Sequence, residues 1–443
     1  MEKTKTIRGV NYLTRWGRGK WKEEGKLGEG LPSFVKVKQI LPRPKVEDIE
    51  VEVARELEKI NLPEIVKPGH MIAVTAGSRG IANIDRILKS VCQKIKEAGG
   101  RPFLVAAMGS HGGGTAEGQR KILSKLGIRE ENLGVPVLVS DQVVQLGCTS
   151  SGFPVYCARE AVEADGLVVV NRVKPHTAFR GENESGLLKM MAVGLGRVPG
   201  ATVVHRLGPG EMARTIPEIA REMLTRLPVL FGLAIVENGY EETAIIKAIR
   251  PEQFQEEEKK LLQEARKLLP QLPVNSLDLL IVKEMGKNFS GTGMDTNVIG
   301  RWRVFGIPEP DVPHIRRIVV LDLSPQSHGN ATGIGLADFT TRRLVKKINF
   351  EATYLNCLTT GFVQRAMLPM VFESDREAID VAVRSLHMDA GQVRALLIDN
   401  TLHLQELYAS ETLLPELAER ADLRVEKEAF PLRFSTTGEL IDP

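Results

Sequence analysis

The chain has 443 residues, 42% of them hydrophobic and 26% charged, and a formal net charge of +3 at pH 7. These values are typical of a soluble globular protein with two or three domains. The nearly balanced charge gives no reason to expect nucleic acid or a membrane surface as partner, and no run approaches the roughly 20 apolar residues that span a bilayer.

The first residues carry Lys and Arg, but no apolar stretch of signal-peptide length follows them. The four cysteines are scattered without C-x-x-C spacing, which argues against a zinc knuckle or a disulfide framework. We therefore expect a reduced, cytoplasmic setting. These cysteines are Cys92, Cys148, Cys157 and Cys357.

From about residue 70, short apolar runs alternate with amphipathic stretches. Thr115 is a good N-cap for one of the resulting helices. Alternating strands and helices predict a parallel sheet covered on both faces, which is a Rossmann-like α/β domain. The predicted strands are 71–75, 102–107, 137–140, 166–170 and 229–236, and the predicted helices are 84–96, 115–126 and 251–269.

The sequence Pro270–Gln271–Leu272–Pro273 interrupts this pattern, because proline cannot continue a helix. We place a domain boundary there, with an N-terminal catalytic domain over 1–272. A C-terminal α/β domain over 273–443 would complete the active-site cleft. Its predicted strands are 277–283, 315–323 and 395–399, and its predicted helices are 338–347, 376–387 and 411–419.

Catalytic and binding groups collect where buried strands end, and the first two such loops here are rich in glycine. Arg79, in the loop 75–80, could hold a carboxylate or phosphate through its planar fork, or could be a solvated arginine in a tight turn. The loop 109–115 contains His111 and could turn backbone N–H groups toward an anion at a helix start. It matches neither the Walker spacing nor G-x-G-x-x-G, so a flexible turn is an equal alternative.

Three more residues that can carry chemistry follow the predicted strand 166–170. His176 comes after a proline, Lys189 lies among apolar residues that would lower its pKa, and His205 could offer a neutral nitrogen to a transition metal. The alternatives are a structural histidine, a lysine that reaches to solvent, and a histidine on a helix surface. Since no histidine pair has zinc-site spacing, a bound metal would need most of its ligands from an organic cofactor.

The order of these segments resembles the nickel-dependent lactate racemase family, whose members use a nickel-pincer nucleotide. The resemblance covers most of the chain, best over residues 70–206 and more weakly over 284–306. It rests on Gly109–Ser110–His111 with Thr115 and Glu117, on Pro175–His176, on Gly186 with Lys189, and on His205.

The resemblance implies a role for each of these residues. Lys189 would carry the cofactor through its amine, as a thioamide, and His205 would complete a planar nickel site. His111 and His176 would be acid/base groups on opposite faces of the substrate, while Arg79 would hold its carboxylate. The glycines that would shape the cofactor-binding loop are Gly109 and Gly112.

The chain also departs from the family pattern. The family's aspartate, three positions before the arginine, is Ala76, and its Tyr, Gln and Lys in the second domain correspond to Ile299, Gly300 and Arg303. These differences predict a substrate other than lactate. A larger hydroxy acid, a dicarboxylate or a sugar acid would fit a pocket opened at Gly300 and lined by Arg79, Arg303 and Lys287.

The leading hypothesis is a 2-hydroxy-acid racemase or epimerase that works by reversible hydride transfer to a nickel-pincer nucleotide. Its partners would be a small hydroxy acid and the enzymes that make the cofactor. The first alternative is a relative without the cofactor that acts as a lyase or hydrolase on an acidic metabolite. The second is a binding protein that holds a nucleotide in its glycine loops.

Overall fold

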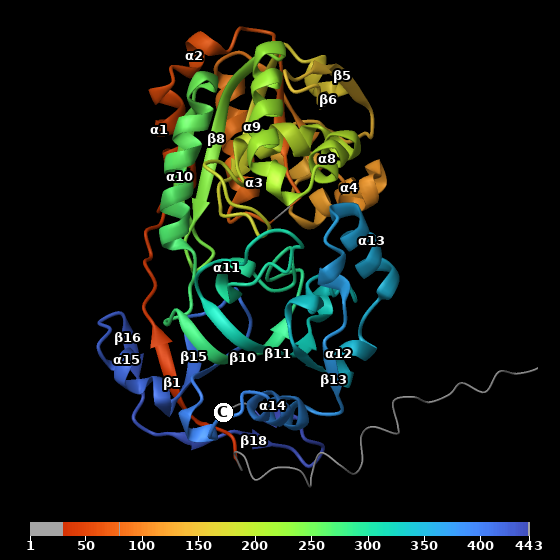
Figure 1. Ribbon diagram of the computed structural model, residues 1–443. Helices are drawn as coiled ribbons and strands as arrows, with labels where there is room; N and C mark the ends of the chain where they lie inside the picture. The colour runs from red at the N-terminus through yellow and green to blue at the C-terminus, as the bar shows by residue number, and fades with distance from the viewer. Residues whose placement is uncertain (1–29, 79, 442–443) are drawn as a thin grey trace, which may run out of the picture.

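The computed structural model describes residues 30–78 and 80–441. Two α/β units, each built on one sheet, lie one above the other (Figure 1). In the described part of the chain no single helix is long and apolar enough to cross a membrane, although one pair bent by 111°, Leu187–Leu195 with Arg197–Arg206, meets these requirements jointly. The prediction of an α/β protein with parallel sheets is confirmed.

The first unit is built on a sheet with the order β4-β3-β2-β7-β8-β9, in which only β9 runs antiparallel. Alternate residues of β2 reach opposite faces, with Ala73 in one core and Ile72 and Val74 in the other. Apolar residues on both faces explain the continuous apolar runs in the sequence. The strands are β2 (Met71–Ala76), β3 (Arg101–Ala106), β4 (Val137–Leu138), β7 (Gly166–Arg172), β8 (Val229–Glu237) and β9 (Thr243–Ile249).

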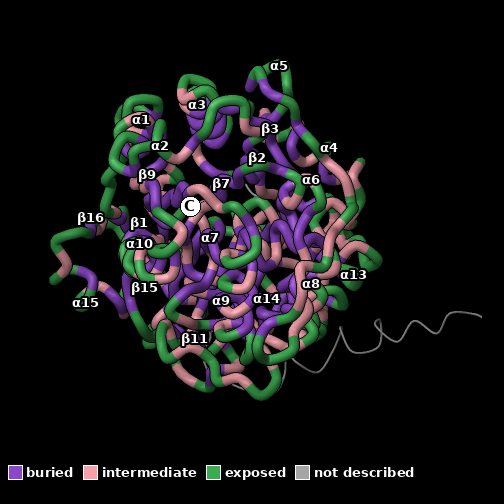
Figure 2. The backbone as a smooth tube through the Cα atoms, turned by 90° about the horizontal axis from the view of Figure 1, so that it is seen from above, coloured by how far each residue is buried: buried purple, intermediate pink, exposed green. Residues whose placement is uncertain are grey.

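Helices cover both faces of this sheet. Helices α1 and α3 bury the face that carries Ile72, while α9 and α10 bury the opposite face. Seen from above, buried residues concentrate at the centre of the molecule and exposed residues follow its rim (Figure 2). The helices of this unit are α1 (Ile49–Lys59), α2 (Leu62–Ile65), α3 (Ile84–Glu97), α4 (Ala116–Lys125), α5 (Glu130–Leu133), α6 (Arg159–Val162), α7 (Leu187–Lys189), α8 (Arg197–Arg206), α9 (Pro209–Arg226) and α10 (Phe254–Leu268).

The second unit has a sheet with the order β13-β12-β11-β10-β14-β15-β1-β16. The first five strands of this order are parallel, and the other three join by antiparallel pairing. The strands in this order are β1 (Ser33–Gln39), β10 (Ser276–Met285), β11 (His314–Leu323), β12 (Phe339–Thr341), β13 (Met370–Phe372), β14 (Ala395–Ile398), β15 (Glu406–Ser410) and β16 (Leu423–Val425). A ninth strand, β17 (Phe430–Pro431), pairs antiparallel with β1.

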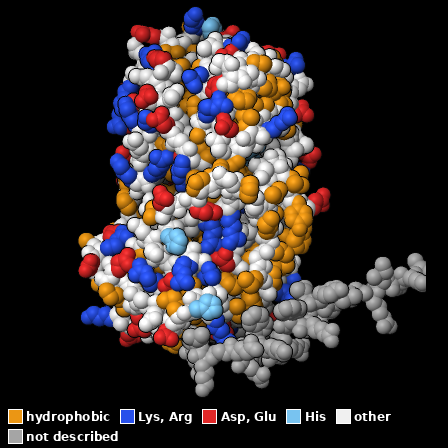
Figure 3. All heavy atoms as spheres, viewed as in Figure 1, with side chains coloured by type: hydrophobic (Ala, Val, Ile, Leu, Met, Phe, Trp, Pro, Cys, Tyr) orange, Lys and Arg blue, Asp and Glu red, His pale blue; other side chains and the backbone are white. Residues whose placement is uncertain are grey.

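The helices of the second unit also pack on both faces of its sheet. α14 buries the face that contains Leu279 and Ile281, and α12 and α15 bury the face that contains Leu280 and Val282. Exposed acidic and basic side chains are interspersed on the surface, and apolar side chains gather on the side where α13 lies (Figure 3). These helices are α11 (Thr296–Ile299), α12 (Arg342–Lys346), α13 (Phe350–Thr360), α14 (Asp375–Arg384) and α15 (Leu414–Ala418).

Each sheet has a switch point, which is a pair of neighbouring parallel strands from which the chain proceeds toward opposite edges of the sheet. In the first sheet it lies between β2 and β7, and in the second between β10 and β14. Such points leave a crevice at the carboxyl ends of the strands, where ligands bind in open α/β sheets. The segments at these ends include 77–78, 80–82 and 173–177 in the first unit and 286–291 in the second.

The strand pairing places one segment differently from the predicted domain division. The boundary at residue 272 stays a prediction, but residues 33–39, which it assigns to the first domain, form β1 of the second sheet. The cause is burial, because Phe34 and Val37 fill the two cores of that sheet. The chain therefore starts its described part in the second unit, builds the first, and returns.

Two further comparisons with the predicted elements are informative. The helix predicted over 338–347 is wrong in its first part, where β12 adds a strand, and α12 starts only after Thr341, whose hydroxyl accepts from the Leu344 amide. The hairpin of β5 (Val143–Cys148) and β6 (Pro154–Ala158) was not predicted. Both strands are short, β5 (VVQLGC) is only partly buried, and β6 (PVYCA) begins with a proline. Neither therefore has the long, uninterrupted apolar run of a central strand.

Replacing Phe34 with alanine tests the placement of β1. The side chain is fully buried in the second unit, so we expect Phe34→Ala to lower the free energy of unfolding by about 3–5 kcal/mol. Ile40→Ala, at the exposed end of the same segment, should cost less than about 1 kcal/mol. Urea unfolding followed by circular dichroism measures both, and equal costs would contradict the pairing.

Candidate active site

A cavity of about 630 Å³ lies between the carboxyl ends of the two sheets. The loops after β2 and β7 line it from the first unit, together with the segment around Lys189, and the loop after β10 lines it from the second. Both switch points thus open into the same space. Of the residues predicted from the sequence, the cavity brings together His111, His176, Lys189 and Lys287.

His111 begins the short 3-10 turn after β3. Its Nδ1 lies 2.7 Å from the carbonyl oxygen of Met108. A carbonyl can only accept, so Nδ1 carries the proton of the neutral ring and Nε2 carries the lone pair. His111 is therefore set up as a proton acceptor.

The glycines of this loop shape the backbone and do not line the cavity. Gly109 has φ +57°, and a Cβ there would lie 3.2 Å from both Cγ1 and the carbonyl oxygen of Val193. Gly112 has φ +67°, and a Cβ there would lie 2.6 Å from the Gly118 carbonyl carbon. Both positions therefore need glycine for the turn that presents His111. The predicted cofactor contact of Gly109 and Gly112 stays a prediction.

His176 lies in the loop after β7, and charged side chains hold its backbone on both sides. The buried carboxylate of Glu184 accepts from its amide, and Arg180 Nη1 donates to its carbonyl oxygen at 2.8 Å. In the ring, Nδ1 accepts from the Ala178 amide at 3.2 Å, so Nε2 carries the proton of the neutral form. The neutral His176 ring therefore donates through Nε2, which is the opposite of His111.

The surroundings keep His176 uncharged. Burial lowers the pKa of its imidazole well below the usual range, and the positive charges of Lys189 and of neighbouring basic groups lower it further. Phe179 packs against the ring at 4.4 Å between centroids. His176 is thus a neutral hydrogen-bond donor at physiological pH.

Lys189 ends the short helix α7, which a π-helical turn (Met190–Leu195) connects to α8. Its Nζ lies 3.4 Å from the hydroxyl oxygen of Ser185, on the cavity wall. Asn171, at the end of β7, donates to the Gly186 carbonyl oxygen at 2.7 Å and so ties the start of α7 to the sheet. The lysine is held close to the carboxyl edge of the first sheet.

A buried glutamate supports α7 from behind. Glu258 of α10 accepts from the Leu188 amide at 3.1 Å, and a Cβ at Gly186 would lie 2.3 Å from its carboxylate. In the described structure its Oε1 is buried without a hydrogen-bond partner, and burial raises its pKa to about 7. Gly186 is therefore required at this position because any larger residue would displace the carboxylate that caps the helix.

His205, on α8, lies beside the cavity rather than on its wall. Its Nδ1 is buried and has no hydrogen-bond partner among the described residues. Burial and the charge of Lys189 lower its pKa to about 4, so the ring is neutral. A neutral imidazole with an unpartnered nitrogen is suited to bind a metal.

The protein offers no complete metal site of its own over residues 30–78 and 80–441. No group of three or more His, Cys, Asp or Glu there could hold an ion. The donors present thus fit a metal that brings most of its ligands with it.

Three predicted substrate-binding features have different outcomes. Arg79 lies outside the described residues. Lys287 lines the cavity, where its Nζ donates to the Gly291 carbonyl oxygen at 2.6 Å and to Asn356 Oδ1 at 2.7 Å. Arg303 does not line it, because its guanidinium binds the Asp338 carboxylate and the carbonyl oxygen of Gly335.

The expected opening at Gly300 is also absent from the described cavity wall. Gly300 has φ +59°, and a Cβ there would lie 1.8 Å from the Pro313 carbonyl oxygen. Ile299 is fully buried in the core of the second unit. Gly300 is thus needed for a close backbone approach and Ile299 for core packing. The prediction that Gly300 enlarges the pocket is wrong.

Sequence reasoning missed several residues of the site. Asn171 is a polar residue at the end of a buried strand, a signal that could have identified it. Glu184 and Glu258 had no such signal, since each lies in a charged stretch where most carboxylates are solvated. The polar loop of the second unit, Asn288–Phe289–Ser290, was missed as well.

Two facing parallel sheets with histidines and a lysine at their carboxyl edges define an α/β protein with an enzyme-like cleft between its units. Residues 30–185 match the family model described as the lactate racemase N-terminal domain. The match includes His111 and His176 and ends before Lys189 and His205.

The sequence has no match among curated proteins. Among solved structures, the lactate racemase apoprotein from Thermoanaerobacterium thermosaccharolyticum matches with a TM-score of 0.48 and 13% identity. The match covers 82% of this chain and 87% of that protein.

Glu258→Gln tests the buried carboxyl behind α7. The folded-state pKa of about 7 exceeds the ordinary 4.5, so ionisation destabilises the fold progressively as pH rises through this window. We expect Glu258→Gln to match the wild type near pH 4.5 and to exceed its stability by about 3 kcal/mol above pH 7. Urea unfolding across this pH range measures it.

A matched control lies on the same helix. Glu264 is half-exposed and pairs with Lys267, so Glu264→Gln should keep the wild-type pH profile. If the free energy of unfolding of Glu258→Gln ran parallel to that of the wild type at every pH, Glu258 would not be a buried carboxyl group that ionises near pH 7.

Lys189→Met tests the electrostatic coupling inside the cavity. Removing the ammonium charge should raise the pKa of His176 toward its ordinary range, because Lys189 is one of the charges that lower it. Titration of the histidine C2 protons by NMR measures this shift. Lys267→Met, on the exposed side of α10, should leave the His176 titration unchanged, and equal behaviour of the two variants would refute the coupling.

Proposed function

We propose that the protein is a 2-hydroxy-acid racemase or epimerase that works with a nickel-pincer nucleotide. The observation that carries the proposal is the single cavity in which His111, His176 and Lys189 meet, with the unpartnered nitrogen of His205 beside it. The match of residues 30–185 to the lactate racemase N-terminal domain supports the reaction class.

The residues present fit the cofactor. Lys189 would carry it through the side-chain amine, and His205 would supply the one protein nitrogen that the metal needs. An imidazole nitrogen is a suitable ligand for nickel. When bound, the cofactor supplies a reversible hydride acceptor for the substrate Cα.

The chain's own residues handle the proton of the substrate hydroxyl. His111, with its Nδ1 fixed on the Met108 carbonyl, accepts that proton at Nε2. His176 donates a hydrogen bond from Nε2 to the same oxygen and so stabilises the negative charge that develops there. For the other enantiomer the two rings exchange these roles, which requires His176 to hold its neutral-form proton on Nδ1 instead of Nε2 and to lose the hydrogen bond from the Ala178 amide.

The exchange of roles requires His176 to accept a proton in one direction. Conversion of the Lys189 ammonium into an amide-like link removes a positive charge that lowers the pKa of His176. Attachment at Lys189 therefore brings the protonated form of His176 closer to physiological pH. Attachment of the cofactor at Lys189 would thus also make His176 a better proton acceptor.

The remaining walls suit a polar organic acid. The second unit contributes Lys287, Asn288 and Ser290, whose groups can bind a carboxylate or additional hydroxyls. Apolar residues of the first unit, including Met108 and Val193, limit the water that reaches the reacting carbon. We infer a hydroxy acid whose carboxylate binds at these groups. Because Gly300 and Arg303 do not line the cavity, a substrate larger than lactate stays a prediction.

The experiment is intact-mass and metal analysis of protein co-expressed with the cofactor-synthesis enzymes. We expect about one nickel per chain and a mass adduct that maps to the peptide containing Lys189. Lys189→Ala should lose both, whereas His205→Ala should keep the adduct and lose nickel. Lys260→Ala, an exposed lysine on α10, should behave as wild type.

Two results would contradict the proposal. If Lys189→Ala kept both the mass adduct and the nickel, Lys189 would not be the residue that carries the cofactor. Turnover of an acidic metabolite without nickel, unchanged in His205→Ala and lost in His176→Ala, would instead support a lyase or hydrolase.

A further inference from the structure

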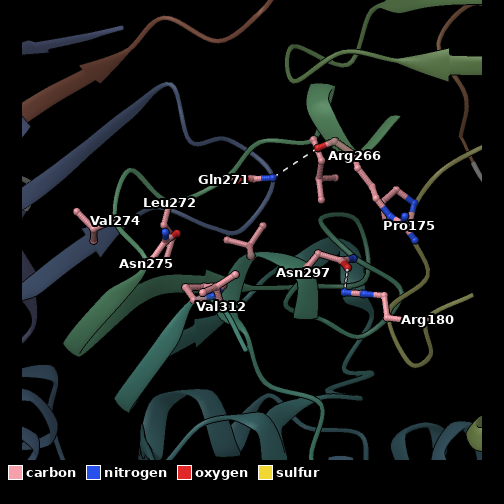
Figure 4. A pocket seen from close by; sticks show the side chains of 12 residues that line it. Pro175, Arg180, Arg266, Gln271, Leu272, Val274, Asn275, Asn297 and Val312 are labelled. Atoms are coloured by element: carbon pink, nitrogen blue, oxygen red, sulfur yellow. Dashed lines mark hydrogen bonds between the residues drawn. The ribbon is translucent and has the colours of Figure 1, made fainter. Parts of the chain in front are cut away.

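A second cavity, of about 290 Å³, lies where the chain passes from α10 to β10 (Figure 4). One wall comes from the first unit, the other from the second, and the connector 269–275 closes it. Pro175 lines both this cavity and the main one. The lining residues used below are Arg180, Arg266, Leu272, Val274, Asn297 and Val312.

The cavity has a charged end and an apolar end. Figure 4 shows Arg266 and Arg180 on the side of Pro175, and Leu272 and Val274 on the opposite side. Small-molecule sites typically combine an apolar lining with a few polar anchors. This arrangement suits a small organic anion whose charged group lies at the arginines and whose short chain lies against the connector.

The two arginines share a single carboxylate. Glu184 lies 2.6 Å from Arg266 Nη2 and 3.8 Å from Arg180 Nη1. The hydrogen bonds that Arg266 donates to Gly181 and to Glu184 both use Nη2. Each fork of the planar guanidinium includes Nη2, so a carboxylate that binds through two N–H groups must share Nη2 with Glu184 or displace it. Burial lowers the pKa of Arg180, consistent with a positive charge that is not fully compensated.

Two of these three side chains, Glu184 and Arg180, hold the backbone of His176. Glu184 accepts from the His176 amide, and Arg180 donates to the His176 carbonyl oxygen. An anion bound to Arg266 would compete with Glu184 for that guanidinium. A change at Glu184 would therefore reach His176 through one hydrogen bond.

We propose that this cavity is an effector site for a small organic monocarboxylate and that its occupancy changes the environment of His176. The cavity is distinct from the main one and does not require the cofactor. The inference therefore goes beyond the proposed function and is tested on the protein without nickel.

The experiment is calorimetric titration of the full chain with butyrate, followed by NMR of the His176 C2 proton. We expect saturable binding and a shift of that resonance. Butyramide, which lacks the charge, and inorganic phosphate, which lacks the apolar chain, should bind at least about tenfold more weakly.

Variants separate the two cavities. Arg266→Gln should weaken butyrate binding at least about tenfold, whereas Lys267→Gln, the exposed neighbour, should leave it unchanged. Val312→Trp should fill the apolar end and block binding with both arginines in place, so the test stands even if Arg266→Gln unfolds.

Two outcomes would overturn the proposal. One is butyrate binding that survives Val312→Trp. The other is binding that Lys287→Gln abolishes, because the anion would then occupy the main cavity. Neither outcome bears on whether Lys189 carries a cofactor, so this inference and the proposed function fail separately.

Discussion

The carbonyl oxygen of Thr177 joins the two units next to the reacting groups. It accepts from the Thr296 hydroxyl at 2.9 Å and from Arg365 Nη2 at 3.0 Å, and both donors belong to the second unit. Arg365 is only 1% exposed, and although burial lowers its pKa to about 10 it stays charged at physiological pH. A buried charge that loses its partners is costly, so this contact fixes the second unit against the residue that follows His176.

The chemistry of the cavity follows from backbone groups around the two histidines. The Met108 carbonyl fixes a proton on His111 Nδ1, and the Ala178 amide keeps His176 Nδ1 unprotonated. Both rings line the same cavity, and their neutral forms differ at Nε2, which has the lone pair in His111 and the proton in His176. A reaction with one proton acceptor and one hydrogen-bond donor needs such a difference. Lys189 lines the same cavity, and its charge lowers the pKa of His176.

Much of the first unit could be predicted from the sequence because its strands are apolar on both faces and its helices have a clear period. Because these apolar strands could be recognised, the loops that follow β3 and β7 could be recognised too, and they contain His111 and His176. The assignment of β1 could not be predicted, because a strand's sequence does not say which sheet it joins across more than 360 residues to β15. That pairing depends on tertiary packing, in which Phe34 is buried in the core of the second unit.

The errors at the site have physical causes too. Arg303 looked available in the sequence, but the fold uses its charge to neutralise Asp338. Gly300 suggested an open pocket, whereas it is required by a close approach to the Pro313 carbonyl. Glu258 gave no signal because its neighbours on α10 are solvated acids, and only packing against Gly186 distinguishes it.

The central claim is that the cavity interconverts mirror-image hydroxy acids by moving the Cα hydrogen as a hydride. The most direct measurement follows 2-hydroxy acids that carry deuterium at Cα, incubated with the nickel-loaded protein in ordinary water and separated by chiral chromatography and mass spectrometry. The account predicts that the inverted product of at least one acid keeps its deuterium. Inversion with deuterium replaced by solvent hydrogen would mean proton abstraction from carbon, and would contradict the account.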